Sequence, residues 1–103
     1  METREKFTRD QVKVMVFDAV KYHFKLLDDE VDESTNFYKD LEADQSCMFY
    51  LDHNEIQTDI ERKYGVDLGS VLDRKDHIYD YRNVDTVKDM IELYYSVLNG
   101  YVD

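Results

Sequence analysis

Three histidines and one cysteine are the side chains of this 103-residue chain that are best suited to bind a transition metal. No two of His23, His53 and His77 stand four residues apart, the spacing that places two imidazoles on one face of a helix. A structural zinc site also needs more thiolate or imidazole ligands than Cys47 and one histidine supply. We therefore expect no metal site.

Cys47 and His53 are the pair to consider for nucleophilic catalysis, as a thiol and its base. They are six residues apart, and at about 100° per helical residue this spacing puts them on different faces. No third group to orient the base is visible in the sequence. We expect no catalytic residue, and we do not expect this chain to be an enzyme.

The elements that must position any functional side chain are helices. The chain has no proline and only three glycines, whereas a sandwich or barrel needs many turn residues. Apolar residues make up 43% of the chain, which is enough for one small core. We expect an all-α fold in a single domain over residues 1–103.

The first helix is expected to begin after Thr8, because Thr8 and Gln11 have the spacing of a capping box. Apolar residues then recur at helical spacing, from Val12 through Val16, Ala19 and Val20 to Leu27. This apolar stripe is expected to face the core.

A second helix is expected from about Gln45 to Tyr64, with Asp44 as its N-cap and Gly65 as its stop signal. A brief third helix could begin after Ser70. The last helix is expected to have Asp85 as its N-cap and to end at Asn99-Gly100. The residues expected inside the core are Val16, Val20, Phe37, Ile56, Ile60, Val87 and Ile91.

Three segments together resemble an acyl carrier protein. They are the pattern F-x-x-D-L-x-A-D at residues 37–44, an acidic helix that ends in Glu61-Arg62-Lys63-Tyr64-Gly65-Val66, and the downstream residues 84–91. The similarity covers most of the chain, from about Val12 to about Leu98. It implies a small acyl-carrier-like bundle of three main helices and one short helix, which carries a group between enzymes.

The resemblance also implies a 4′-phosphopantetheine cofactor on a serine at the start of the second helix. The family reads Asp-Ser-Leu there, whereas this chain reads Asp44-Gln45-Ser46. A hydroxyl at a helix N-terminus suits a phosphodiester, because free amides and the helix dipole favour the anion. Ser46 is therefore the candidate attachment residue. The alternative is a degenerate carrier fold without the group, which acts as a protein-interaction module.

Charge bears on the choice of partner. The net charge is −11, which disfavours binding to nucleic acid or to anionic membranes and favours basic protein surfaces. The expected partner-binding residues are the acids of the second helix and its cap, Asp44, Asp52, Glu55 and Asp59. Partners would be basic enzyme surfaces or a phosphopantetheinyl transferase. An acidic decoy that mimics nucleic acid is a further alternative.

Compartment and assembly follow from simpler features. One cysteine forms no disulfide within the chain, which is compatible with a reducing cytoplasm. No apolar run approaches the length needed to span a bilayer, so we expect no membrane insertion. We expect a cytoplasmic monomer.

Overall fold

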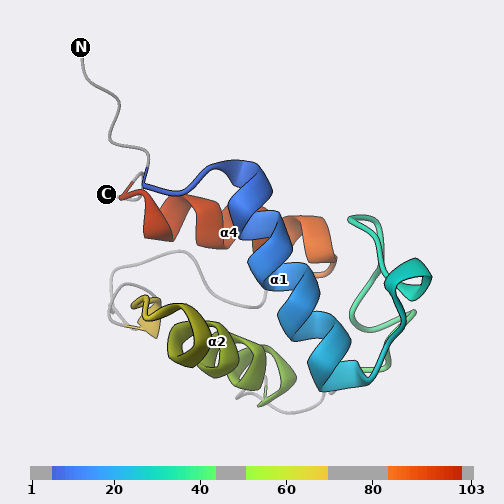
Figure 1. Cartoon of the computed structure of the whole chain (residues 1–103). Helices are drawn as coiled ribbons and strands as arrows, with labels where there is room; N and C mark the ends of the chain where they lie inside the picture. Colours follow the sequence, from blue (N-terminus) through green and yellow to red (C-terminus); the bar gives the residue numbers. More distant parts are fainter. Residues whose placement is uncertain (1–5, 44–50, 70–83, 101–103) are drawn as a thin grey trace.

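The computed structural model describes residues 6–43, 51–69 and 84–100, and these residues form an all-α bundle (Figure 1). Its elements are α1 (Arg9–Phe24), the 3-10 turn η1 (Asp28–Glu30), α2 (Leu51–Tyr64) and α4 (Val87–Leu98). Helix α1 packs against both α2 and α4. No strand occurs in the described residues, where the sole β-type pairing is an isolated bridge between Asn36 and Thr86. The expected all-α bundle is confirmed.

The capping box at the start of α1 is confirmed. The Thr8 hydroxyl accepts from the Gln11 N–H at 3.1 Å, and the Gln11 side chain accepts from the Thr8 N–H at 2.8 Å. The expected apolar stripe holds as far as Val20, but the prediction for Leu27 is wrong, since that side chain is 69% exposed. The helix ends at Phe24 because Lys25 adopts a left-handed conformation (φ 58°), so Leu27 no longer follows the helical period.

Helix α2 ends at Tyr64, as expected, and its described part begins at Leu51. Gly65 follows Tyr64 with φ +65°, a conformation that favours glycine, and its N–H donates to the carbonyl of Glu61 at 2.9 Å. The expected cap Asp44, the expected first residues 45–50 and the brief helix after Ser70 lie outside the described residues.

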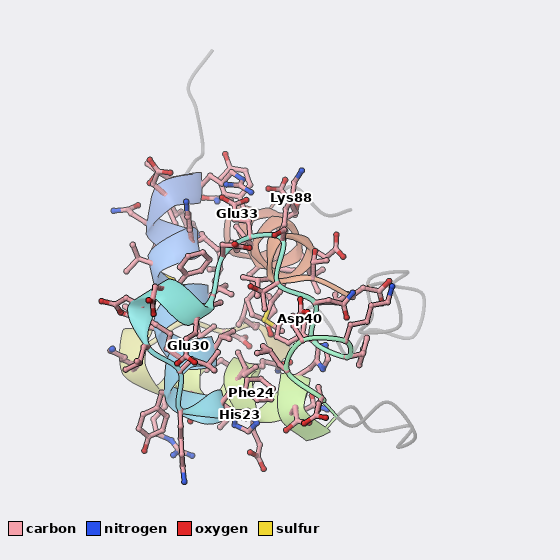
Figure 2. The ribbon with its side chains drawn as sticks, turned by 90° about the vertical axis from the view of Figure 1, so that its right-hand side faces the viewer. His23, Phe24, Glu30, Glu33, Asp40 and Lys88 are labelled. Atoms are coloured by element: carbon pink, nitrogen blue, oxygen red, sulfur yellow. The ribbon has the colours of Figure 1, made fainter. Side chains whose placement is uncertain are left out.

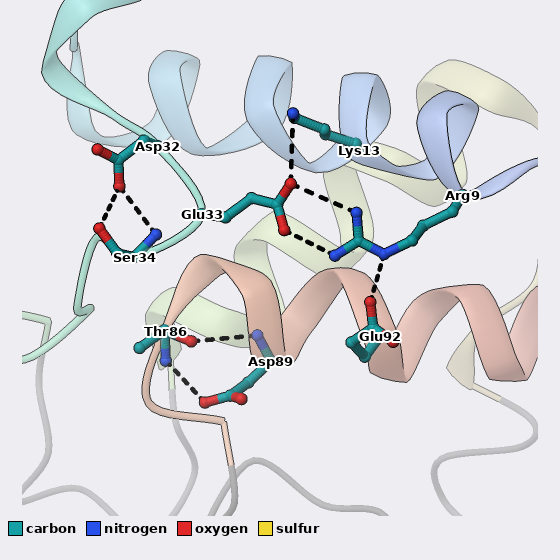
Figure 3. Close-up of polar contacts among 8 residues, drawn as sticks. All are labelled: Arg9, Lys13, Asp32, Glu33, Ser34, Thr86, Asp89 and Glu92. Atoms are coloured by element: carbon teal, nitrogen blue, oxygen red, sulfur yellow. Dashed lines mark hydrogen bonds and ion pairs between the residues drawn. The ribbon is translucent and has the colours of Figure 1, made fainter.

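Helix α4 begins one residue later than expected, so the prediction of Asp85 as its N-cap is wrong. Thr86 is the cap: its hydroxyl accepts from the Asp89 N–H at 3.2 Å, and the Asp89 carboxylate accepts from the Thr86 N–H at 3.1 Å (Figure 3). The carbonyl of an N-cap accepts the first bond of the helix. The Asp85 carbonyl instead accepts from the Phe37 N–H at 2.8 Å, whereas the Thr86 carbonyl accepts from Met90.

All seven residues expected in the core are buried, with 0–1% of each side chain exposed. The core also contains residues that the sequence analysis did not select, among them Met15, Leu68 and Met90. The predicted core is therefore confirmed, and it is contributed by all three helices together with the loop that follows α1.

That loop, residues 25–43, is held against the start of α4. Val31 and Phe37 point into the core, with 6% and 0% of their side chains exposed. Backbone N–H groups of Phe37, Val87 and Lys88 donate across the contact, at 2.8, 3.0 and 2.9 Å. The long connection thus has a fixed course over the described residues.

An ion network joins α1, the loop and α4 (Figure 3). Arg9 of α1 donates to both carboxylate oxygens of Glu33 in the loop, at 2.7 and 3.3 Å, and also donates to Glu92 of α4. Lys13 lies 3.3 Å from Glu33. The hydrogen bond from Arg9 lowers the pKa of Glu33 to about 2. This contribution to stability is present above the ordinary pKa of 4.5 and is lost as pH falls toward 2.

A buried asparagine fixes the backbone that precedes α1. Asn99 is 4% exposed and follows the last residue of α4. Its side-chain oxygen accepts from the N–H groups of Lys6 and Phe7, and its amide donates to the carbonyls of Phe7 and Tyr95, both at 2.9 Å. One side chain thereby ties the end of α4 to the entry of α1.

A buried histidine predicts a specific pH dependence. His53 of α2 is fully buried, its Nε2 lies 3.3 Å from the carbonyl oxygen of Val84, and burial lowers its pKa below the ordinary 6.5. The unfolded chain therefore binds a proton more readily than the folded one, so the free energy of unfolding should fall as pH drops below 6.5. One such proton gives a slope of at most about 1.4 kcal/mol per pH unit.

Urea unfolding at a series of pH values between about 8 and 5 tests this expectation. The His53→Gln variant should show a shallower fall in stability than the native chain, whatever its absolute stability. Parallel curves for the two proteins would show that His53 does not titrate as proposed.

Candidate functional site

Of the residues expected at a functional site, Ser46 and Asp44 lie outside the described residues, whereas Asp52, Glu55 and Asp59 lie on α2. The structure places these three acids on the flank of α2 that faces the C-terminal half of α1. The Glu55 side chain is 66% exposed, whereas that of Asp52 is 26% exposed.

His23, in the last turn of α1, brings two of these acids together. Its Nε2 lies 2.7 Å from the Asp52 carboxylate and its Nδ1 lies 3.3 Å from the Glu55 carboxylate. Figure 2 shows His23 and Phe24 at the end of α1, beside α2. The His23 ring also meets the Phe24 ring edge-on, with centroids 4.7 Å apart. The contacts of the His23 ring with Asp52 and Glu55 therefore connect α1 to α2 through polar groups.

The sequence analysis did not assign His23 this role. It placed the residue near the apolar stripe of the first helix, and its partner Asp52 is 29 residues away in the sequence. The available signal was its position in the last turn of the helix, where the helix dipole favours basic side chains. That signal identifies a helix end but does not identify a partner.

Two adjoining hollows lie between α1 and α2, with volumes of about 860 and 340 Å³. We call them together the α1–α2 groove. Tyr22, Asp59 and Arg62 line both hollows. The larger is also lined by Lys21, His23, Lys25, Asn54, Glu55 and Thr58. The smaller is also lined by Met15, Asp18, Ala19, Lys63 and Tyr64.

The charges along this groove fall into two groups. Lys21 is paired, since it donates to Asp28 at 2.7 Å, which raises the pKa of Lys21 and lowers that of Asp28. Lys63 lies 3.8 Å from Asp18. Asp59 and Arg62, by contrast, make no ion pair with any residue that the structure describes. Asp59 is therefore an acid of the groove, and Arg62 and Lys25 are cations of the groove, that form no ion pair among the described residues.

The α1–α2 groove is lined by buried apolar residues and by charged residues of both signs. Within residues 6–43, 51–69 and 84–100, no group of three or more His, Cys, Asp or Glu side chains is placed to hold a metal ion. In the same residues, no helix combines the length and apolar character needed to cross a bilayer. A surface that combines apolar residues with charged residues of both signs is compatible with a protein-contact surface.

Comparison with known proteins adds no relative, because no family model, no curated protein and no solved structure matches this chain.

Proposed function

We propose that this chain is a non-catalytic docking module of the acyl-carrier type, which presents the flank of α2 to basic surfaces of partner enzymes. The observation that carries the proposal is the gathering of Asp52, Glu55 and Asp59 on one flank of α2, with Glu55 66% exposed. Carboxylates at an open rim steer basic partners and set orientation more than they add affinity.

The proposed cargo is an acyl or related group, held as a thioester on 4′-phosphopantetheine at Ser46. Two features support this. Ser46 shortly precedes α2 in the sequence, and the loop up to residue 43 is anchored to α4 through Phe37 and Val87. Enzymes that load and use the cargo would be the partners, in the cytoplasm, where a lone cysteine stays reduced.

The mixed charge of the described α2 flank favours protein docking over nucleic-acid mimicry. A decoy for a DNA-binding cleft needs a surface of one sign, since its ligand is adapted to a row of phosphates. On this flank Arg62 and Lys63 stand one turn beyond Asp59. The second form of the proposal is a module that docks on partner enzymes without any prosthetic group, because the acids of the α2 flank are present whether or not Ser46 is modified.

Enzymatic loading tests the carrier form. Incubation with coenzyme A and a broad-specificity phosphopantetheinyl transferase should add one phosphopantetheine to the intact mass. Ser46→Ala should abolish the addition, whereas the control Ser96→Ala, on α4, should leave it intact. A folded protein that several transferases fail to modify would contradict the carrier form, and addition that survives Ser46→Ala would contradict Ser46 as the site.

Charge reversal tests the docking flank in the same assay. Glu55→Lys should lower the loading rate several-fold at low salt, because it removes an exposed acid from the flank. Asp29→Lys makes the same change in net charge on η1, at a residue that does not line the groove, and should leave the rate near that of the native chain. Equal losses in both variants would show a general charge effect rather than docking on α2.

A further inference from the structure

Tyr22 is the most exposed of the large hydrophobic side chains described, at 79%, compared with Leu27 at 69% and Val14 at 55%. It projects from α1 where the two hollows of the α1–α2 groove meet, and it lines both. Tyrosine is enriched at protein interfaces, where it often contributes a large share of the binding energy. An exposed tyrosine at the junction of two hollows is a projection that a partner surface can cover.

The smaller hollow can receive a side chain of the same kind. It is lined by Met15 and Ala19, which are 5% and 8% exposed, and by Tyr64. Four charged residues also line it: Asp18, Asp59, Arg62 and Lys63. Its volume of about 340 Å³ exceeds that of a tyrosine side chain, and a phenol ring that enters with its hydroxyl toward the rim would bury apolar surface and keep a polar contact.

The open charges also form a complementary set. Asp59 and Arg62 lie three residues apart on α2, and both line both hollows. A two-fold axis between two antiparallel copies of α2 would bring Arg62 of each copy opposite Asp59 of the other. Such close pairs at a covered surface add to specificity and fix the register.

We propose that the α1–α2 groove is the interface of a symmetric homodimer, in which Tyr22 of each copy enters the smaller hollow of the other and Arg62 pairs with Asp59 across the axis. An isologous interface needs one patch that carries both halves of every contact, and this groove carries a projection, a hollow and both charges. The dimer does not depend on the carrier role. The proposed dimer replaces the expectation of a monomer. Because its interface covers the docking flank of α2, the dimer and a docked enzyme would exclude one another.

The dimer is expected to be of modest strength. Each chain carries a net charge of −11, so the two copies repel one another. Salt weakens this long-range repulsion more than it weakens the attraction between charges in direct contact. We expect a dissociation constant in the micromolar range at about 0.15 M salt.

Sedimentation equilibrium of the full chain over a range of concentrations tests the interface. The mass of the native chain should rise from 12.4 kDa toward twice that value. Tyr22→Ala should weaken association about tenfold or more. Leu27→Ala also truncates an exposed apolar side chain, but outside the groove, and should dimerise as the native chain does.

A charge exchange makes the test specific for two-fold symmetry. Asp59→Arg and Arg62→Asp should each abolish the dimer, because each places like charges opposite one another. The double variant Asp59→Arg/Arg62→Asp should restore it, with circular dichroism used to verify that all variants fold. A native chain that stays at monomer mass up to about 1 mM, a dimer indifferent to Tyr22→Ala, or a double variant that stays monomeric would overturn the proposal. None of these results depends on loading at Ser46, so the dimer and the carrier role are decided separately.

Discussion

Replacement of Phe37 by alanine is expected to lower the free energy of unfolding by about 3–5 kcal/mol, the largest effect of any single change considered. The Phe37 ring is fully buried and joins the loop to two helices. Its centroid lies 6.4 Å from the Phe24 ring of α1 and 4.7 Å from the His53 ring of α2. Removal would leave a cavity where the loop, α1 and α2 meet.

The backbone around Phe37 limits how far this cavity can collapse. The Phe37 N–H donates to the Asp85 carbonyl, and the Phe37 carbonyl accepts from the Ala43 N–H, both at 2.8 Å. Urea unfolding followed by circular dichroism measures the loss, and Leu27→Ala, in the same loop but exposed, should change stability by less than about 0.5 kcal/mol. A Phe37→Ala protein as stable as the Leu27→Ala control would show that the loop does not depend on this residue.

Replacement of Ile60 by alanine is expected to cost about 2–5 kcal/mol. Ile60 is 1% exposed and lies one turn from Ile56, which is fully buried, on the core face of α2. Three methyl or methylene groups would leave the core without replacement, while the helix itself would gain slightly, since alanine has the highest helix propensity. The lost packing is larger than this gain.

The matched control for Ile60 is Val14→Ala, an aliphatic truncation on a helix at a side chain that is 55% exposed. It should leave the urea midpoint almost unchanged. If Ile60→Ala shifts the midpoint no more than Val14→Ala does, then the core assigned to α2 is wrong. If both shift it equally and strongly, then the exposed face of α1 has a role in the folded protein that the monomer does not explain.

Local signals in the sequence predicted the fold well. The capping box at Thr8 and the glycine stops at Gly65 and Gly100 depend on neighbouring residues alone, and each has the expected geometry. The core residues of α2 and α4 also follow from spacing, because apolar residues that recur at the helical period lie on one face, and that face is the buried one. These features could be predicted because no distant partner is needed to specify them.

The two errors have different causes, one a distant contact and the other the local end of a helix. Asp85 has a good capping side chain, but its carbonyl is bonded to Phe37, 48 residues earlier, so the cap moved to Thr86. Leu27 fits the stripe of α1 by spacing, but the helix had already ended at Lys25. A pattern along the chain contains neither kind of information.

The candidate site was the least predictable part. The acids Asp52, Glu55 and Asp59 could be listed from the sequence, but the groove exists only because α1 packs beside α2. Tyr22 was one of nine tyrosines, with nothing local to distinguish it. Its significance comes from the hollow next to it, which is a property of two helices together.

The contacts of Asn99 have a consequence for the order in which the molecule assembles. Asn99 binds backbone groups 92 and 93 residues earlier, so these bonds close nearly the whole described chain into a ring. Contacts of such long range form after local ones, because the entropy of closing the ring opposes them. On a translating ribosome, the backbone at Lys6 and Phe7 must wait for these bonds until residue 99 has been synthesised. In the finished protein, the amide protons of these two residues exchange with solvent when their bonds to Asn99 open, so their exchange reports on the contact between the entry of α1 and the end of α4.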